Sequence, residues 1–81
     1  MKSLLSNIDK IHTTELGVLR IKKNLSLKTN EVVSWCKKQI QQADRIERRG
    51  KNWYVYSKDA VLTVHAGSYT LITAHKNKIK V

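Results

Sequence analysis

The sequence lacks proline and low-complexity stretches, so it offers no linker that would separate two domains. We therefore expect its 81 residues to form one domain (1–81) with a helical half (1–42), a sheet (43–76) and a basic tail (77–81). No apolar run approaches the roughly 18 residues of a membrane span, and the first apolar stretch is too short for a signal-peptide core. These absences favour a cytoplasmic protein.

Cysteine is nearly absent, since Cys36 is the only one in the sequence. A single cysteine excludes an internal disulfide and any zinc site built from several cysteines. Because Cys36 lies at helical spacing among apolar residues, we expect it in the core. The three histidines have no acidic or cysteine neighbours at ligand spacing, and no glycine-rich loop offers a phosphate cradle. The sequence therefore predicts neither a bound metal nor a cofactor.

Acidic residues are also few: six of them face sixteen lysines and arginines, which gives a formal net charge of +10. The excess is even along the chain, because residues 1–40 and 41–81 each hold eight basic and three acidic side chains. A domain of this kind most often meets nucleic acid, through phosphate contacts and counterion release. We expect RNA as the partner, with an acidic protein such as an antitoxin or a host complex as the alternative. No membrane association is expected.

The first half of the chain has apolar residues at helical spacing. One stripe covers residues 4–11. A second helix follows a threonine N-cap and is expected to bury Leu16 and Leu19. A third helix, within 29–42, begins at a threonine or asparagine cap and buries a further apolar set: Val32, Val33, Cys36 and Ile40.

From residue 43 onward the pattern changes to the period of two that is typical of strands. Four segments separated by turns are predicted as strands: Asp44–Arg49, Trp53–Tyr56, Ala60–His65 and Tyr69–Lys76. The first is rich in charge, which suits an edge. The expected fold class is α+β, with two or three N-terminal helices packed on one face of a three- to four-stranded antiparallel sheet.

The last two strands decide which side chains share the uncovered face of this sheet. A three-residue loop at 66–68 would pair His65 with Tyr69 and Val61 with Thr73. This register predicts a polar face of Thr63, His65, Tyr69, Thr73 and His75, and a core side of Leu62, Val64, Ile72 and Ala74. A loop one residue longer or shorter would reverse that relation, because strand side chains alternate.

Two histidines on one face suggest acid–base chemistry on RNA. Without a metal, one imidazole would take the proton of a 2′-hydroxyl while the other protonates the leaving 5′-oxygen. We therefore predict His65 and His75 as catalytic residues, with Arg20 neutralising charge on the phosphorane. Lys22, Lys23 and Lys76 are the alternatives for that electrostatic role. Alternatively the histidines are solvated surface residues, and His12 is a cap or a local hydrogen-bond donor.

A wider set of side chains is predicted to hold nucleic acid. Basic residues would contact phosphates, and tyrosines would stack on bases. The predicted set is Lys22, Lys23, Arg45, Arg48, Arg49, Lys51, Tyr54, Tyr56, Tyr69, Thr73 and Lys76. The alternatives are a solvated edge for the arginine run and cross-strand packing for the aromatic residues.

Four segments of the sequence carry a resemblance to known proteins: Ile11–Gly17, Arg20–Leu25, Gly50–Tyr56 and Ser68–Lys76. On these segments, nearly the whole chain resembles a family of small bacterial and phage proteins that is described only as a domain of unknown function. This resemblance implies no activity.

The order of helices, the Arg20–Lys23 segment and the final sheet are also similar, in layout, to the barnase–EndoU–colicin–RelE-type fold. BrnT-like and RelE-like toxin ribonucleases have that fold, with site residues gathered over the open sheet face. By this likeness the positions to test are Arg20, Lys22, His65, Thr73 and His75.

We therefore expect a small basic RNA-directed protein, a metal-independent endoribonuclease of toxin type. Two alternatives remain open: a nucleic-acid-binding module without catalysis, and a phage-type inhibitor that docks on a host nucleoprotein complex.

Overall fold

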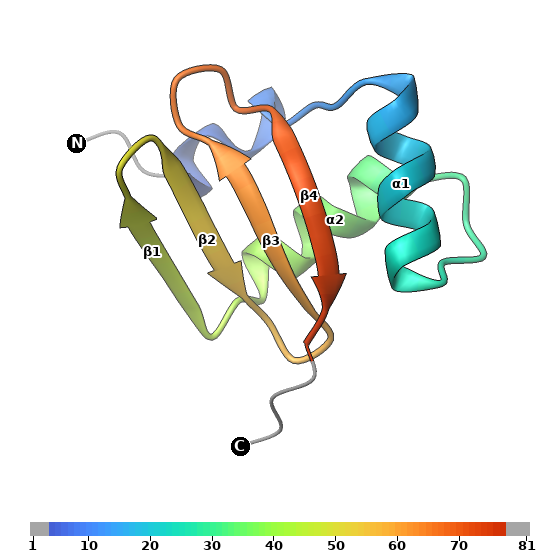
Figure 1. The fold of residues 1–81 in the computed structure, drawn as a ribbon. Helices are drawn as coiled ribbons and strands as arrows, with labels where there is room; N and C mark the ends of the chain where they lie inside the picture. Colours follow the sequence, from blue (N-terminus) through green and yellow to red (C-terminus); the bar gives the residue numbers. More distant parts are fainter. Residues whose placement is uncertain (1–3, 78–81) are drawn as a thin grey trace.

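The computed structural model describes residues 4–77 and has an α+β fold, as predicted (Figure 1). A short 3-10 helix, η1, precedes two α-helices and an antiparallel sheet in which the strands follow their chain order, β1-β2-β3-β4. The predicted basic tail lies, from residue 78 onward, outside the described residues. The elements are η1 (Leu5–Lys10), α1 (Glu15–Leu25), α2 (Val32–Gln41), β1 (Arg45–Arg49), β2 (Asn52–Tyr56), β3 (Ala60–His65) and β4 (Leu71–Lys76).

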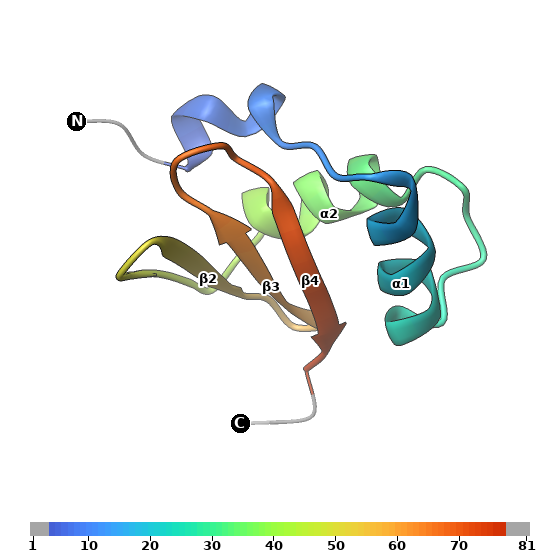
Figure 2. The ribbon, with the colours of Figure 1, turned by 45° about the horizontal axis from the view of Figure 1, so that its top comes forward.

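One face of the sheet is packed and the other is not. Strict alternation in β2 and β3 buries every second side chain, so that Val55, Leu62 and Val64 are fully enclosed. Helix α2 runs behind the sheet on this side, and η1 closes the end near the β3–β4 loop (Figures 1 and 2). The helices therefore leave the opposite face uncovered.

Helix α1 begins as predicted, but it buries other residues. The hydroxyl of Thr14 accepts a hydrogen bond from the backbone N–H of Gly17, which makes Thr14 the N-cap. The prediction that Leu16 and Leu19 face the core is wrong, because both are exposed while Ile21 and Leu25 are buried. Two stripes with helical spacing exist in this segment, and the packing against β4 and α2 selects the second one.

Helix α2 confirms the predicted interior stripe, since Val32, Cys36 and Ile40 are buried and Val33 is partly buried. The helix starts later than predicted, at Val32, because Thr29 accepts the N–H of Glu31 and so closes a turn before the helix.

The β3–β4 register differs from the prediction because the loop is longer than predicted and β4 has a bulge at Ile72. His65 and Thr70 close a longer loop than predicted, in which Tyr69 adopts a left-handed conformation with a φ of 59°. Thr63 pairs with Thr73, but Val64 then pairs with Leu71, which leaves Ile72 as the extra residue. Leu71 therefore fills the core, and the prediction that Ile72 does so is wrong.

The two edges of the sheet are protected in different ways. At β4 the edge is covered, because the linker before α1 forms a β-bridge between His12 and Thr70 and the Asn24 amide donates to the carbonyl of Ala74 at 3.3 Å. Figure 2 shows α1 beside β4 rather than behind the sheet. At β1 the edge carries three arginines and a glutamate, as predicted for a charged edge strand.

Candidate nucleic-acid interface

The uncovered sheet surface, which we call the open face, has three cross-strand rows of side chains. The strand register defines them, since side chains at paired positions lie on the same side of the sheet. The rows are Arg45–Tyr56–Val61–His75, Glu47–Tyr54–Thr63–Thr73 and Arg49–Asn52–His65. Successive rows lie about 7 Å apart along the strands.

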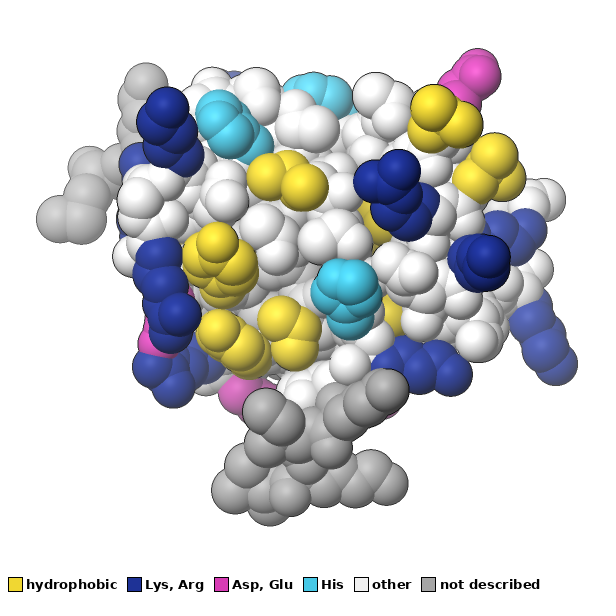
Figure 3. Space-filling view, viewed as in Figure 1, with side chains coloured by type: hydrophobic (Ala, Val, Ile, Leu, Met, Phe, Trp, Pro, Cys, Tyr) yellow, Lys and Arg dark blue, Asp and Glu magenta, His cyan; other side chains and the backbone are white. Residues whose placement is uncertain are grey.

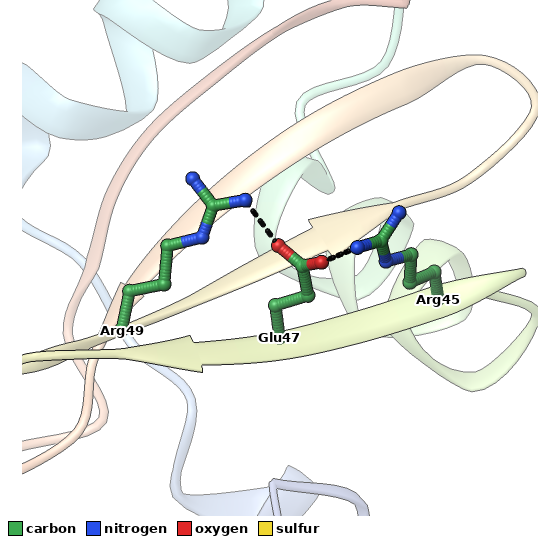
Figure 4. Close-up of polar contacts among 3 residues, drawn as sticks. All are labelled: Arg45, Glu47 and Arg49. Atoms are coloured by element: carbon green, nitrogen blue, oxygen red, sulfur yellow. Dashed lines mark hydrogen bonds and ion pairs between the residues drawn. The ribbon is translucent and has the colours of Figure 1, made fainter.

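Arginines and tyrosines form a ladder on the β1–β2 side of the open face. Glu47 pairs with Arg45 on one side and with Arg49, at 2.6 Å, on the other (Figure 4). The guanidinium carbon of Arg45 lies 5.9 Å from the ring centre of Tyr56, and that of Arg49 lies 5.7 Å from Tyr54. Both arginine side chains are about two-thirds exposed. The ladder therefore places two aromatic rings and two exposed cations side by side.

Hydrogen-bonding side chains and the apolar Val61 occupy the β3–β4 side of the open face. Thr63 and Thr73 are direct cross-strand partners, and the hydroxyl of Thr73 lies 3.4 Å from the Nε2 atom of His75. The predicted sharing of one face by Thr63, Thr73, His65 and His75 is confirmed. It holds because the true register differs from the predicted one by two residues, a shift that preserves the face.

His65 and His75 nevertheless lie at opposite ends of the open face. His75 pairs with Val61, four residues along β3 from His65, which corresponds to about 13 Å along the strand. An acid and a base that act on one phosphodiester must both reach oxygens bound to the same phosphorus. This geometry does not bring the two imidazoles to one phosphate.

The structure instead links His65 to His12 through two hydroxyls at the β3–β4 loop. The Ser68 hydroxyl lies 3.2 Å from Nδ1 of His65 and 2.7 Å from the hydroxyl of Thr70, which in turn lies 3.2 Å from Nε2 of His12. The backbone N–H of Ser68 also donates to Nδ1 of His65. Sequence reasoning did not connect these residues, because His12 is more than fifty positions away and reaches the loop through the β-bridge to Thr70.

Helix α1 contributes one basic residue to the border of the open face. Arg20 is one turn before Asn24, whose side chain bonds to β4, so Arg20 lies on the sheet side of α1. Lys22 is directed away, because its ammonium group donates to the side chain of Asn30 at 2.8 Å. Lys23 is exposed on the outer side of the helix. The predicted grouping of Arg20 with Lys22 is therefore wrong.

Three other predicted binding residues lie on the helix side of the sheet instead. Arg48 pairs with Trp53 and lies over its ring at 5.3 Å. Tyr69 packs on Trp53 at 5.4 Å between ring centres, because its left-handed backbone turns it across the sheet. Lys76 pairs with Ala60 and so alternates away from His75. The prediction that Tyr69 shares the open face with His65 and His75 is therefore wrong. Lys76 alternates with His75 as predicted, and its contact with nucleic acid, like that of Arg48, stays a prediction.

Lys51 lies in a turn at the end of the sheet, between the residues of the open face and those of the helix side. It is an exposed residue in the β1–β2 turn, and its carbonyl accepts the N–H of Ala66 from the neighbouring loop.

Basic side chains border the open face on two sides. In Figure 3, Lys and Arg side chains gather along β1 and over α1, with hydrophobic and histidine side chains between them. Among residues 4–77, Glu47 is the single carboxylate in the three rows of the open face, and two arginines already neutralise it.

Other parts of the described chain offer less. A polar hollow of about 270 Å³ beside the β2–β3 turn is lined by Gln39, Gln42, Asp44, Ser57, Lys58 and Asp59. Its two carboxylates oppose a polyanion. Residues 4–77 contain no cluster of three or more His, Cys, Asp or Glu side chains suited to a metal ion. Within the same range, no helix combines the length and the apolar character that a membrane crossing requires.

Comparison with known proteins identifies a family and no activity. The model of the family described as "Protein of unknown function (DUF3781)" matches residues 5–75. No curated protein and no solved structure matches the chain. The likeness in layout to toxin ribonucleases therefore stays a prediction.

Proposed function

The chain belongs to the family of proteins of unknown function DUF3781, and we propose that it binds single-stranded RNA across the open face. The observation that carries this proposal is the arginine–tyrosine ladder of Arg45, Arg49, Tyr54 and Tyr56 beside hydrogen-bonding strands. Single-stranded nucleic acid is bound by surfaces of this composition, in which aromatic rings stack on bases and cations follow the backbone.

The contacts within the ladder are weak enough for a stacked base to replace them. An exposed cation–π contact is worth about 0.5–1 kcal/mol, and an exposed ion pair contributes about 0–1 kcal/mol. A base stacked on an aromatic side chain contributes about 1–3 kcal/mol. A base therefore displaces the guanidinium from the ring of Tyr54 or Tyr56, and the released cation then pairs with a phosphate.

The remaining open-face groups suit RNA in particular. The hydroxyls of Thr63 and Thr73, at the centre of the surface, and the imidazole of His75, at one end of it, are hydrogen-bonding groups. A 2′-hydroxyl is both a donor and an acceptor, and it distinguishes RNA from DNA. We propose binding rather than cleavage as the function, because His65 and His75 lie too far apart to serve one phosphate together.

Fluorescence anisotropy with a labelled single-stranded RNA of about 10 nucleotides tests the proposal directly. The titration is repeated at several salt concentrations in EDTA, and the RNA is then run on a denaturing gel. We expect binding that weakens with salt, intact RNA, and weaker binding of the DNA of the same sequence.

Two neighbouring arginines provide a matched pair of variants. Arg49→Gln removes a cation from the open face, whereas Arg48→Gln removes the same charge from the helix side of the same strand. We expect Arg49→Gln to weaken binding and to lower the salt slope by about 0.7 for one lost phosphate contact. Equal effects of the two variants would show that net charge alone attracts the RNA, and the open face would then not be the site.

A further inference from the structure

Two leucines of α1 are exposed in a way that the packing of this domain does not explain. Leu16 and Leu19 keep 73% and 64% of their surface in contact with solvent, the largest values for big hydrophobic residues among those described. Small soluble domains expose single apolar residues freely, but neighbouring ones on a rigid element mark interaction sites.

These leucines form a ridge together with a basic residue. Leu16, Leu19 and Lys23 follow each other at i, i+3 and i+7, so they lie along one side of α1, which we call the α1 ridge. Arg20 borders the ridge towards the sheet, and the buried Ile21 and Leu25 hold the opposite side of the helix against the core. Figure 3 shows hydrophobic and basic side chains together over α1.

Helix α1 presents the ridge in a fixed conformation. Thr14 caps its first turn, and the N–H of Ser26 bonds to the carbonyls of Lys22 and Lys23 at its end. The side chain of Asn24 ties the helix to β4. A surface that is already ordered costs little conformational entropy when a partner binds to it.

We propose that the α1 ridge is the docking surface for an acidic amphipathic helix of a partner protein. A ridge of leucines on one helix packs into the groove between the apolar side chains of another. The cations Arg20 and Lys23 at this ridge select a helix whose apolar side is bordered by carboxylates. Glu15, at the first turn of α1, is the acidic exception near the ridge.

Other occupants fit the surface less well. A second copy of the chain would bring two proteins of formal charge +10 together. A membrane surface requires a broader apolar side than two leucines provide. RNA gains nothing from leucine side chains, which neither stack on bases nor bond to them.

A synthetic helical peptide with leucines on one side and glutamates elsewhere is the probe, and a scrambled peptide of the same composition is its control. By fluorescence anisotropy we expect the amphipathic peptide to bind roughly 10-fold more tightly than the scrambled one. Leu16→Gln/Leu19→Gln is expected to remove that preference, since about two buried leucines are lost from the contact. Leu5→Gln, which changes an exposed leucine of η1, is expected to leave it unchanged.

The remaining outcomes oppose the proposal in distinct ways. Equal binding of both peptides means that charge alone attracts them. A dimer in sedimentation that Leu16→Gln/Leu19→Gln abolishes assigns the ridge to a second copy, and loss of binding to anionic lipid vesicles in that variant assigns it to a membrane. Circular dichroism verifies that the variant is folded. Its RNA binding is expected to equal that of the unchanged protein, so this inference and the proposed function fail separately.

Discussion

The two faces of the sheet are built from the same strands, yet different constraints act on them. On the helix-covered face, Val55, Leu62 and Val64 have no exposed surface, and any change of shape there disturbs the core. On the open face, Tyr54 and Thr63 alternate with those residues and are only partly buried. Packing on the helix-covered face therefore fixes the backbone of the strands. The side chains of the open face are not needed for that packing and are free to serve binding.

The largest expected effect is the loss of stability when a side chain of the helix-covered face, rather than one of the open face, is shortened. Leu62→Ala removes a fully enclosed side chain from a central strand, and we expect it to lower the free energy of unfolding by about 2–5 kcal/mol. Thr63→Ala, one position away on the open face, is expected to cost less than about 1 kcal/mol. Urea unfolding followed by circular dichroism measures both. Similar losses would mean that the open face is also a packed surface.

The same comparison explains which parts of the fold were predictable. Alternation in β2 and β3 is complete, so the strands and their buried residues follow from the period of two. In α1 two apolar stripes compete, and only contacts with β4 and α2 make Ile21 and Leu25 the buried pair instead of Leu16 and Leu19. Local pattern predicts the element, but tertiary packing decides its orientation.

The same alternation of strand side chains made part of the candidate site predictable, namely which residues share the open face. The face shared by His65 and His75 follows from the period of two. Their separation was predictable as well, because the expected register places His75 opposite Asp59, six residues from His65, and the observed register places it opposite Val61, four residues away. The placement of Tyr69 on the helix side depends on its left-handed backbone, which no sequence pattern marks at a tyrosine. The link between His12 and His65 requires the long-range β-bridge to Thr70.

The next effect concerns RNA binding by the open face. Tyr54→Ala removes a ring on which a base is expected to stack, and we expect a loss of about 1–3 kcal/mol in RNA affinity, or roughly 5- to 150-fold. Tyr54→Phe retains the ring and is expected to bind RNA nearly as well as the unchanged protein. Anisotropy titration compares them. Equal losses in both variants would assign the contribution to the hydroxyl rather than to stacking.

The pH dependence of stability tests the helix-covered side of the sheet, and its effect per pH unit is smaller. Burial raises the pKa of the Cys36 thiol from its ordinary 9.0 to about 12. The folded protein therefore keeps the thiol neutral between these values while the unfolded chain loses the proton. The stability that Cys36 contributes is therefore present below about pH 9 and falls by about 1.4 kcal/mol per pH unit as the pH rises from 9 towards 12.

The comparison of the unchanged protein with Cys36→Ala isolates this contribution. The variant has a cavity cost that does not depend on pH, so the difference between the two unfolding free energies should decrease from pH 9 upward. Alkylation at pH 8 should require unfolding, because the thiol is enclosed. Rapid alkylation of the folded protein would contradict the burial of Cys36.

The smallest expected effect has the opposite sign from the other open-face substitutions. Glu47→Gln removes the carboxylate that holds Arg45 and Arg49, and we expect RNA to bind about 2- to 5-fold more tightly because both cations become free for phosphates. Asp59→Asn makes the same change of charge at the polar hollow and is expected to have less effect. If Glu47→Gln weakens binding instead, the ladder serves to hold the tyrosine rings in place, and preorganised stacking rather than free charge determines the affinity of the open face.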